Sequence, residues 1–210
     1  MNGIIGVTYK VGLTICQSIY IQLLFFAYVL KSIIFLGFFP SLYAMFYVIN
    51  ASMNQGFLTY QEINQLFKEA YESQFKTSNI IGYLLAGLLI FESLDLIISK
   101  NFIGQPIVHG ALILLLLMTV GTAVFSFPVL IRYDLTPIQI VKQAFLVAMT
   151  SLVEGLAILI GLMLLPLLYA ISSLLIFIVG FPLSIFVILF FSRQAFIKVE
   201  EKVRKYEENS

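Results

Sequence analysis

Residues 106–131 read PIVHGALILLLLMTVGTAVFSFPVLI, a run without any Asp, Glu, Lys or Arg. A helix that crosses the hydrocarbon core of a bilayer needs about 20 consecutive apolar residues, so this run predicts a membrane-spanning helix. Over the whole chain of 210 residues, 60% are hydrophobic and 11% are charged. Soluble domains average about 25% charged residues. The sequence therefore predicts an integral membrane protein whose main surroundings are the lipid bilayer.

Six apolar runs predict an all-α, polytopic membrane helix bundle in a single domain. Pro40 marks the expected turn between the first two runs, because proline fits a first helical turn but not a helix interior. A five-span alternative, with 13–57 as one re-entrant unit, stays open. Phe-Pro recurs three times at unequal intervals, so no internal repeat is expected. The six predicted spans are 13–37, 41–57, 79–98, 106–131, 138–166 and 168–192.

Lysine and arginine gather on one set of connections, and such an excess indicates the cytoplasmic side of a membrane. The segments 57–78, 132–142 and 193–210 carry them, whereas the opposite connections carry only Lys100. With six spans, both termini are predicted to lie in the cytoplasm. With five spans, the N-terminus would lie outside.

An amphipathic cytoplasmic helix is predicted at 59–76. Thr59 followed by Glu62 has the spacing of a capping box, in which each side chain bonds the backbone of the other residue. Apolar residues then recur at helical spacing on one face. We expect this face either to rest on the protein's own helices or to dock a partner. Its residues are Ile63, Leu66, Phe67, Ala70, Tyr71 and Phe75.

The tail 193–210 is predicted to continue the last span as a helix, because apolar residues recur at 3-4 spacing among its charges. Together with the stripe on 59–76, they form the predicted cytoplasmic docking face. Its residues are Ile63, Leu66, Phe67, Tyr71, Phe196, Val199 and Val203.

Four ionisable residues lie within the predicted spans: Lys31, Glu92, Asp95 and Glu154. Charges in a span usually pair with one another or mark a solute path. We expect Lys31 to pair with Glu92, Asp95 or both. Counting residues from the outer ends of the predicted spans places all three at a similar depth in the membrane. A solute or ion site and simple hydration of the carboxylates are the alternatives.

Glu154 is predicted to face other helices, because small residues beside it allow close helix packing. A hydrogen bond to a neighbouring helix is expected, and the hydroxyl groups of Thr119 and Thr122 are candidate partners if the carboxyl group is neutral. A proton relay is the alternative.

The sequence lacks the common catalytic motifs, including the phosphate-binding loop, HExxH and GxSxG. Its one cysteine and one histidine argue against a disulfide and a zinc site, and a net charge of +1 argues against nucleic-acid binding. We therefore expect neither an enzyme, nor a cofactor, nor a bound metal.

Four segments together resemble the YesL-like family of small integral membrane proteins of Gram-positive bacteria. They are the turn with Phe39, Pro40, Ser41 and Ala44, the passage FKTSNIIGYLL at 75–85, FSFPVLIRYDLTPIQIVKQAFLVAM at 125–149, and FFSRQAFIKVEEK at 190–202. Members of this family commonly occur alongside carbohydrate importers of the ABC type. The resemblance implies an accessory role in the bacterial cytoplasmic membrane.

The missing catalytic motifs predict a non-catalytic membrane protein. The resemblance implies that it is an accessory or regulatory protein associated with carbohydrate uptake, with the membrane subunits of an ABC importer as partners. Two alternatives stay open. A secondary permease would use the intramembrane carboxylates for coupling ions, and a membrane scaffold would assemble through its cytoplasmic helices.

Overall fold

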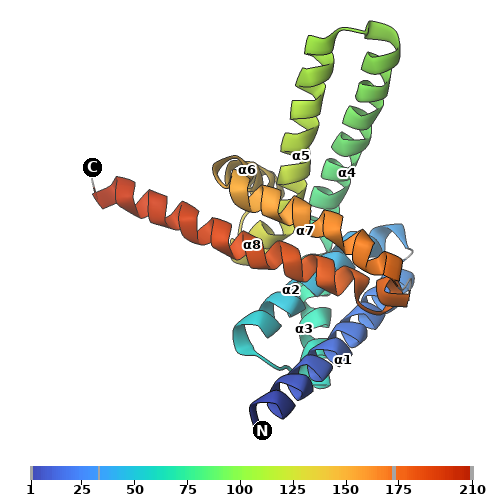
Figure 1. Ribbon diagram of the computed structural model, residues 1–210, viewed down its shortest axis with the longest axis vertical. Coiled ribbons are helices and arrows are strands. Elements are labelled where there is room, and N and C mark those ends of the chain that lie inside the picture. The colour runs from blue at the N-terminus through green and yellow to red at the C-terminus, as the bar shows by residue number, and fades with distance from the viewer. Residues whose placement is uncertain (1, 33, 172–173, 209–210) are drawn as a thin grey trace. The chain divides into compact units, whose positions relative to one another are not determined.

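The computed structural model describes residues 2–32, 34–171 and 174–208, and no strand occurs among them. The predicted all-helical fold is therefore confirmed. Among the described residues, six helices are long and apolar enough to cross a membrane: α1, α2, α4, α5, α7 and α8. The elements are α1 (Asn2–Lys31), α2 (Phe35–Gln55), α3 (Tyr60–Ser73), α4 (Phe75–Ile98), the π-helical turn η1 (Ser99–Ile103), α5 (Pro106–Arg132), α6 (Pro137–Thr150), α7 (Leu152–Ile171) and α8 (Leu174–Glu208) (Figure 1).

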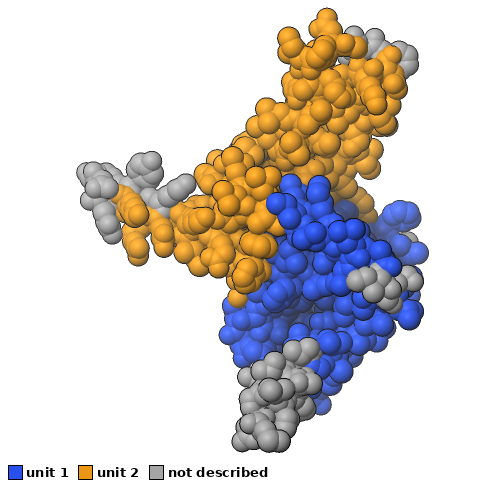
Figure 2. Space-filling view, viewed as in Figure 1, with its two compact units in different colours: residues 1–75, 158–189 blue, residues 76–157, 190–210 orange. Residues whose placement is uncertain are grey.

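The helices group into two compact units (Figure 2). Unit 1 comprises residues 1–75 and 158–189, and therefore contains α1, α2, α3, most of α7 and the first part of α8. Unit 2 comprises residues 76–157 and 190–210, and contains α4, α5, α6, the start of α7 and the end of α8.

The turn between α1 and α2 lies earlier than predicted. α1 ends at Lys31 and α2 begins at Phe35, so Pro40 lies inside α2 instead of at the turn. A Cβ atom on Gly37 would lie 2.9 Å from the Val29 carbonyl oxygen. Because glycine has no side chain, α2 can begin against the last turns of α1.

The predicted fifth span, 138–166, is two helices. α6 ends at Thr150, Ser151 adopts a non-helical conformation (φ −124°, ψ 51°), and α7 begins at Leu152. The predicted start of the sixth span at residue 168 falls inside α7, and α8 begins only at Leu174. The sequence is apolar on both sides of Ser151, so hydropathy could not reveal the break. The predicted span 106–131 matches α5 to within one residue.

The amphipathic helix is confirmed as α3, with the predicted capping box between Thr59 and Glu62. α3 runs alongside α1. The rings of Tyr60 and Tyr20 lie 5.1 Å apart near its start, and those of Tyr71 and Tyr28 lie 4.9 Å apart near its end. The outward face of α3 is polar, and polar groups are costly in lipid, so this face requires water or a polar partner.

α3 and α6 are structural counterparts, although no internal repeat was expected. Both have 14 residues, follow a threonine N-cap with a capping box, and precede the next long helix after one residue. α3 packs on α2, and α6 packs on α5. Every element of the pattern recurs 77 positions later, from Thr59 to Thr136. The buried residues also correspond: Ile63, Phe67, Ala70 and Tyr71 in α3 match Ile140, Ala144, Val147 and Ala148 in α6.

The capping box makes a pH-dependent contribution to the stability of α3. Glu62 Oε2 accepts hydrogen bonds from the Thr59 backbone N–H at 2.7 Å and from the Thr59 hydroxyl at 2.8 Å. These bonds favour the ionised carboxylate and lower the pKa of Glu62. The contribution is therefore fully present above the pKa of Glu62 in the unfolded chain, about 4.3. It is lost as the pH falls through the lower pKa that Glu62 has in the folded protein.

We expect a carbon-detected NMR titration of the Glu62 carboxyl group to give a pKa below its ordinary value. Thr59→Ala removes the hydroxyl but keeps the backbone donor, so it should return the pKa only part of the way. A Glu62 pKa at or above the ordinary value would contradict the observed bonding.

Candidate functional site

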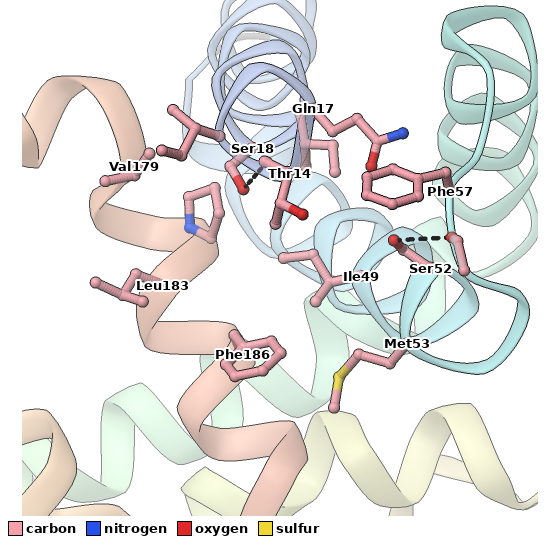
Figure 3. A pocket seen from close by; sticks show the side chains of 14 residues that line it. Thr14, Gln17, Ser18, Ile49, Ser52, Met53, Phe57, Val179, Leu183 and Phe186 are labelled. Atoms are coloured by element: carbon pink, nitrogen blue, oxygen red, sulfur yellow. Dashed lines mark hydrogen bonds between the residues drawn. The ribbon is translucent and has the colours of Figure 1, made fainter. Parts of the chain in front are cut away.

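Unit 1 contains a cavity of about 480 Å³ between α1, α2 and α8 (Figure 3). Its volume falls within the range of about 300–1,000 Å³ that small-molecule sites occupy. Ile49 of α2 and Phe186 of α8 project into the same space from different helices (Figure 3). All three helices are candidate membrane spans. The other apolar lining residues include Ile21, Met53, Val179 and Leu183.

Three polar side chains of the cavity donate to backbone carbonyl groups. Gln17 Nε2 donates to the Leu58 carbonyl at 2.5 Å, and the Ser18 hydroxyl donates to the Thr14 carbonyl at 2.8 Å. The Ser52 hydroxyl donates to the Gly56 carbonyl at 3.3 Å. These donors hold the walls together, so the cavity offers a mainly apolar surface to an occupant.

Gln22 links α1 to α8 next to this cavity, and its side chain is 1% exposed. Its amide nitrogen donates to the carbonyl groups of Ile176 and Phe177 at 2.9 and 2.5 Å. Its amide oxygen accepts from the Phe181 backbone N–H at 3.3 Å. Phe181 directly precedes Pro182, which has no N–H to donate, and Ile176 and Phe177 lie six and five residues before it. Gln22 therefore joins the backbone hydrogen-bonding of α8 where proline weakens it.

Glu92 lies in unit 2, on α4, and is 5% exposed. Its Oε1 accepts a hydrogen bond from the Thr119 hydroxyl of α5 at 2.7 Å. Its Oε2 is buried without a hydrogen-bond partner. The predicted hydroxyl partner Thr119 thus bonds Glu92 instead of Glu154.

Lys31 lies in unit 1, at the end of α1, whereas Glu92 and Asp95 lie in unit 2. The ammonium of Lys31 is 5.5 Å from the centre of the Tyr28 ring, an arrangement in which the ring face attracts the cation. Asp95 is half-buried. The pairing of Lys31 with either carboxylate stays a prediction.

Glu154 is 6% exposed, which confirms that it faces protein. It lies in the first turn of α7 instead of the middle of a span. Lys198 of α8 donates to its Oε1, so a cation on the tail is one partner of this carboxylate. The predicted interior face and the predicted hydrogen bond to a neighbouring helix are both confirmed.

The end of α8 makes three further contacts within unit 2. Arg132 donates to Glu200 Oε1 through Nε at 3.1 Å and Nη2 at 2.6 Å. Phe196 is 3% exposed and lies against the ring of Tyr133, with a centroid distance of 6.1 Å. The guanidinium of Arg132 lies 5.2 Å from the centre of the Phe196 ring. The predicted helical continuation of the last span is confirmed.

The predicted docking face is largely occupied by the protein itself. Ile63, Phe67 and Tyr71 are buried in unit 1, and Leu66 is half-buried. Phe196 is buried and Val199 half-buried, while the side chain of Val203 lies outside the described residues. The face is therefore a packing surface of the folded chain, which leaves little of it for a partner.

Gln17, Gln22 and Lys198 were missed by sequence reasoning. A glutamine inside a predicted span must find hydrogen-bond partners, so Gln17 and Gln22 were detectable as packing residues. Pro182 in the last span was a further signal, because a proline there leaves the helix short of a donor. Nothing local distinguishes Lys198 from the other tail cations.

Residues 18–96 match a family described as DUF624, Protein of unknown function. The match runs from within α1 to within α4, and therefore includes α2 and the capped helix α3. Neither the curated proteins nor the solved structures give a match.

Proposed function

We propose that this chain is a non-catalytic integral membrane protein of the bacterial cytoplasmic membrane that acts as an accessory or regulatory subunit in carbohydrate uptake. The cavity in unit 1 is the observation that carries this proposal. A sugar site needs several polar groups that converge on the ligand, whereas the donor groups of Gln17, Ser18 and Ser52 are already bonded to backbone carbonyl groups. A role through contact with other membrane proteins requires no such groups.

The association with an ABC importer rests on the resemblance to the YesL-like family. The family match at 18–96 covers two of the segments that carry this resemblance, at 39–44 and 75–85. This overlap supports the assignment to a family of small membrane proteins and leaves the importer as a proposal.

The test is co-purification from the native membrane in mild detergent, with an affinity tag on the chain. We expect the membrane subunits of an importer to co-purify in a fixed ratio and to be absent with an unrelated, equally tagged six-span protein. Recovery of the chain alone, at native expression, would contradict the proposal.

A secondary permease is the second candidate, because Glu92 has a buried oxygen without a hydrogen-bond partner. Such a group in a membrane helix is a typical element of an ion path. Proteoliposomes that contain only this chain would then accumulate a labelled solute, and Glu92→Gln should abolish the accumulation. Uptake that survives Glu92→Gln would remove Glu92 from the path.

Both termini are proposed to lie in the cytoplasm. In a Cys16→Ser background, a cysteine at Glu69, on the exposed face of α3, tests whether α3 lies on the cytoplasmic side, from which six spans place both termini in the cytoplasm. A membrane-impermeant maleimide should label it in inside-out vesicles and leave it unlabelled in intact cells. The reverse pattern would contradict the orientation.

A further inference from the structure

The cavity of unit 1 lies at the depth of one membrane leaflet. Its lining residues on α1 fall within 14–21, and those on α2 fall within 49–56. The candidate spans are Gly12–Lys31 and Phe35–Gln55, so the cavity is at the start of one span and at the end of the other. Consecutive spans cross a bilayer in opposite directions, so both stretches lie near the same membrane face. In the proposed orientation this is the cytoplasmic face.

The chemistry of the lining changes with depth. Gln17, Ser18 and Ser52 lie nearer the membrane face, whereas Ile21 and Ile49 lie deeper in the two spans. None of the lining residues that the structure describes is charged. A phosphate or carboxylate group therefore has no counter-charge inside the cavity, and the lining suits the hydrocarbon part of a ligand.

Water is a poor occupant of this space. A buried water molecule needs about two to four polar partners, and the donor groups of Gln17, Ser18 and Ser52 already bond backbone carbonyl groups. The walls are also fixed in place. Gln17 ties α1 to the Leu58 carbonyl, and Gln22 ties α1 to α8, so collapse of the walls onto one another is opposed.

The cavity is accessible from outside unit 1. Three of its lining side chains, Ile15, Phe57 and Phe186, are also exposed at the surface. They belong to α1, to the segment before α3 and to α8. Because α1 and α8 are candidate spans, the molecules that surround this opening in the membrane are lipids.

We infer that the cavity binds one acyl chain of a phospholipid from the adjoining leaflet and leaves the headgroup outside, at the membrane face. Lipid tails are as apolar as leucine, so transfer of the chain out of the bilayer supplies little affinity. The affinity comes from dispersion contacts with walls that are already in place, and it grows with the number of methylene groups that touch them. The inference goes beyond the proposed function and does not depend on an importer.

Quenching of a single tryptophan by a brominated lipid tests the inference. The sequence has no tryptophan, so one introduced indole reports only on its own surroundings. Phe186→Trp puts it at the cavity (Figure 3), in the purified full-length protein in detergent micelles. Phosphatidylcholine with brominated acyl chains should quench it saturably. Phe177→Trp is the matched control, an exposed aromatic of α8 outside the lining, and its quenching should rise in proportion to the lipid fraction without saturating.

Unlabelled competitors show which part of the lipid is recognised. Dioleoylphosphatidylcholine and dioleoylphosphatidylglycerol should relieve the quenching of Phe186→Trp at concentrations within about twofold of each other, because the lining has no charge to select a headgroup. Dihexanoylphosphatidylcholine has the same headgroup with short chains and should not relieve it. Relief by the short-chain lipid, or a strong preference for one headgroup, would overturn recognition of the acyl chain. Relief by oleate but by neither dioleoyl lipid would overturn a phospholipid as the source.

Filling the cavity should exclude the chain. Ile49 projects into the cavity, so Ile49→Phe in the Phe186→Trp background should raise the concentration of brominated lipid for half-maximal quenching at least about tenfold. Ile160→Phe is the matched control, an exposed isoleucine of α7 outside the lining, with an expected change of less than about twofold.

Ser18→Leu fills the cavity from α1 and replaces Ile49→Phe if that variant does not fold, because the Ser18 hydroxyl bonds only within its own helix. The competition series needs neither filling variant. An unchanged half-maximal concentration in a folded filling variant would overturn the inference, as would quenching of Phe186→Trp that does not saturate.

Discussion

Gln22→Leu is expected to lower the free energy of unfolding by about 2–4 kcal/mol, because each buried polar group that loses its partner costs about 1–3 kcal/mol. The substitution removes the amide that bonds the Ile176 and Phe177 carbonyl groups and the Phe181 N–H. Leucine keeps the volume but offers no hydrogen bond. Chemical unfolding in detergent micelles measures the loss.

Gln17→Leu is the graded control, because Gln17 makes one such bond, to the Leu58 carbonyl. Its expected loss is about 1 kcal/mol. Equal losses for the two variants would show that the additional hydrogen bonds between Gln22 and α8 do not add to the free energy of unfolding.

Gly37→Ala is expected to destabilise unit 1 by about 1–3 kcal/mol, the usual cost of forcing extra atoms into a packed site. The new Cβ would lie 2.9 Å from the Val29 carbonyl oxygen and 3.0 Å from the Tyr28 carbonyl oxygen. Both are backbone atoms of the last turns of α1, so they cannot rotate away as a side chain would. The free energy of unfolding, again measured in micelles, should fall.

Two other glycines calibrate this effect. Gly87, on α4, has no atom within 4 Å of its Cβ position, so Gly87→Ala should be neutral or stabilise by up to about 1 kcal/mol through helix propensity. A Cβ on Gly161 would meet only a Val187 side-chain atom, at 2.7 Å, and a side chain can shift. A loss at Gly37 no greater than that at Gly161 would contradict the close backbone approach.

Only the capping-box spacing of the correspondence between α3 and α6 is visible in the sequence, as Thr59 before Glu62 and Thr136 before Gln139, because other equivalent positions carry different chemistry. Lys68 and Glu69 on the outer face of α3 correspond to Phe145 and Leu146 on α6. The two helices share a cap, a length and a buried stripe, whereas the side chains on their outward faces differ in polarity. Burial in the structure revealed the 77-residue period that residue identity conceals.

The sequence by itself determined the helical membrane class, the capped helix α3 and the helical tail. Each of these depends on neighbouring residues: apolar runs long enough for a bilayer, a threonine three residues before a glutamate, and apolar residues at helical spacing. Such patterns lie within a few turns of one helix, so they can be recognised without knowing how the helices pack.

Only the tertiary structure decided the break at Ser151 and the partners of the buried polar groups. Periodicity placed Glu154 on an interior face, but its counter-charge lies 44 residues away on the tail. Thr119 was a candidate partner of Glu154 from the sequence, and in the structure its hydroxyl donates to Glu92. A buried polar group must be paired, yet which group pairs it depends on how whole helices cross, and that is set by the fit of many side chains at once.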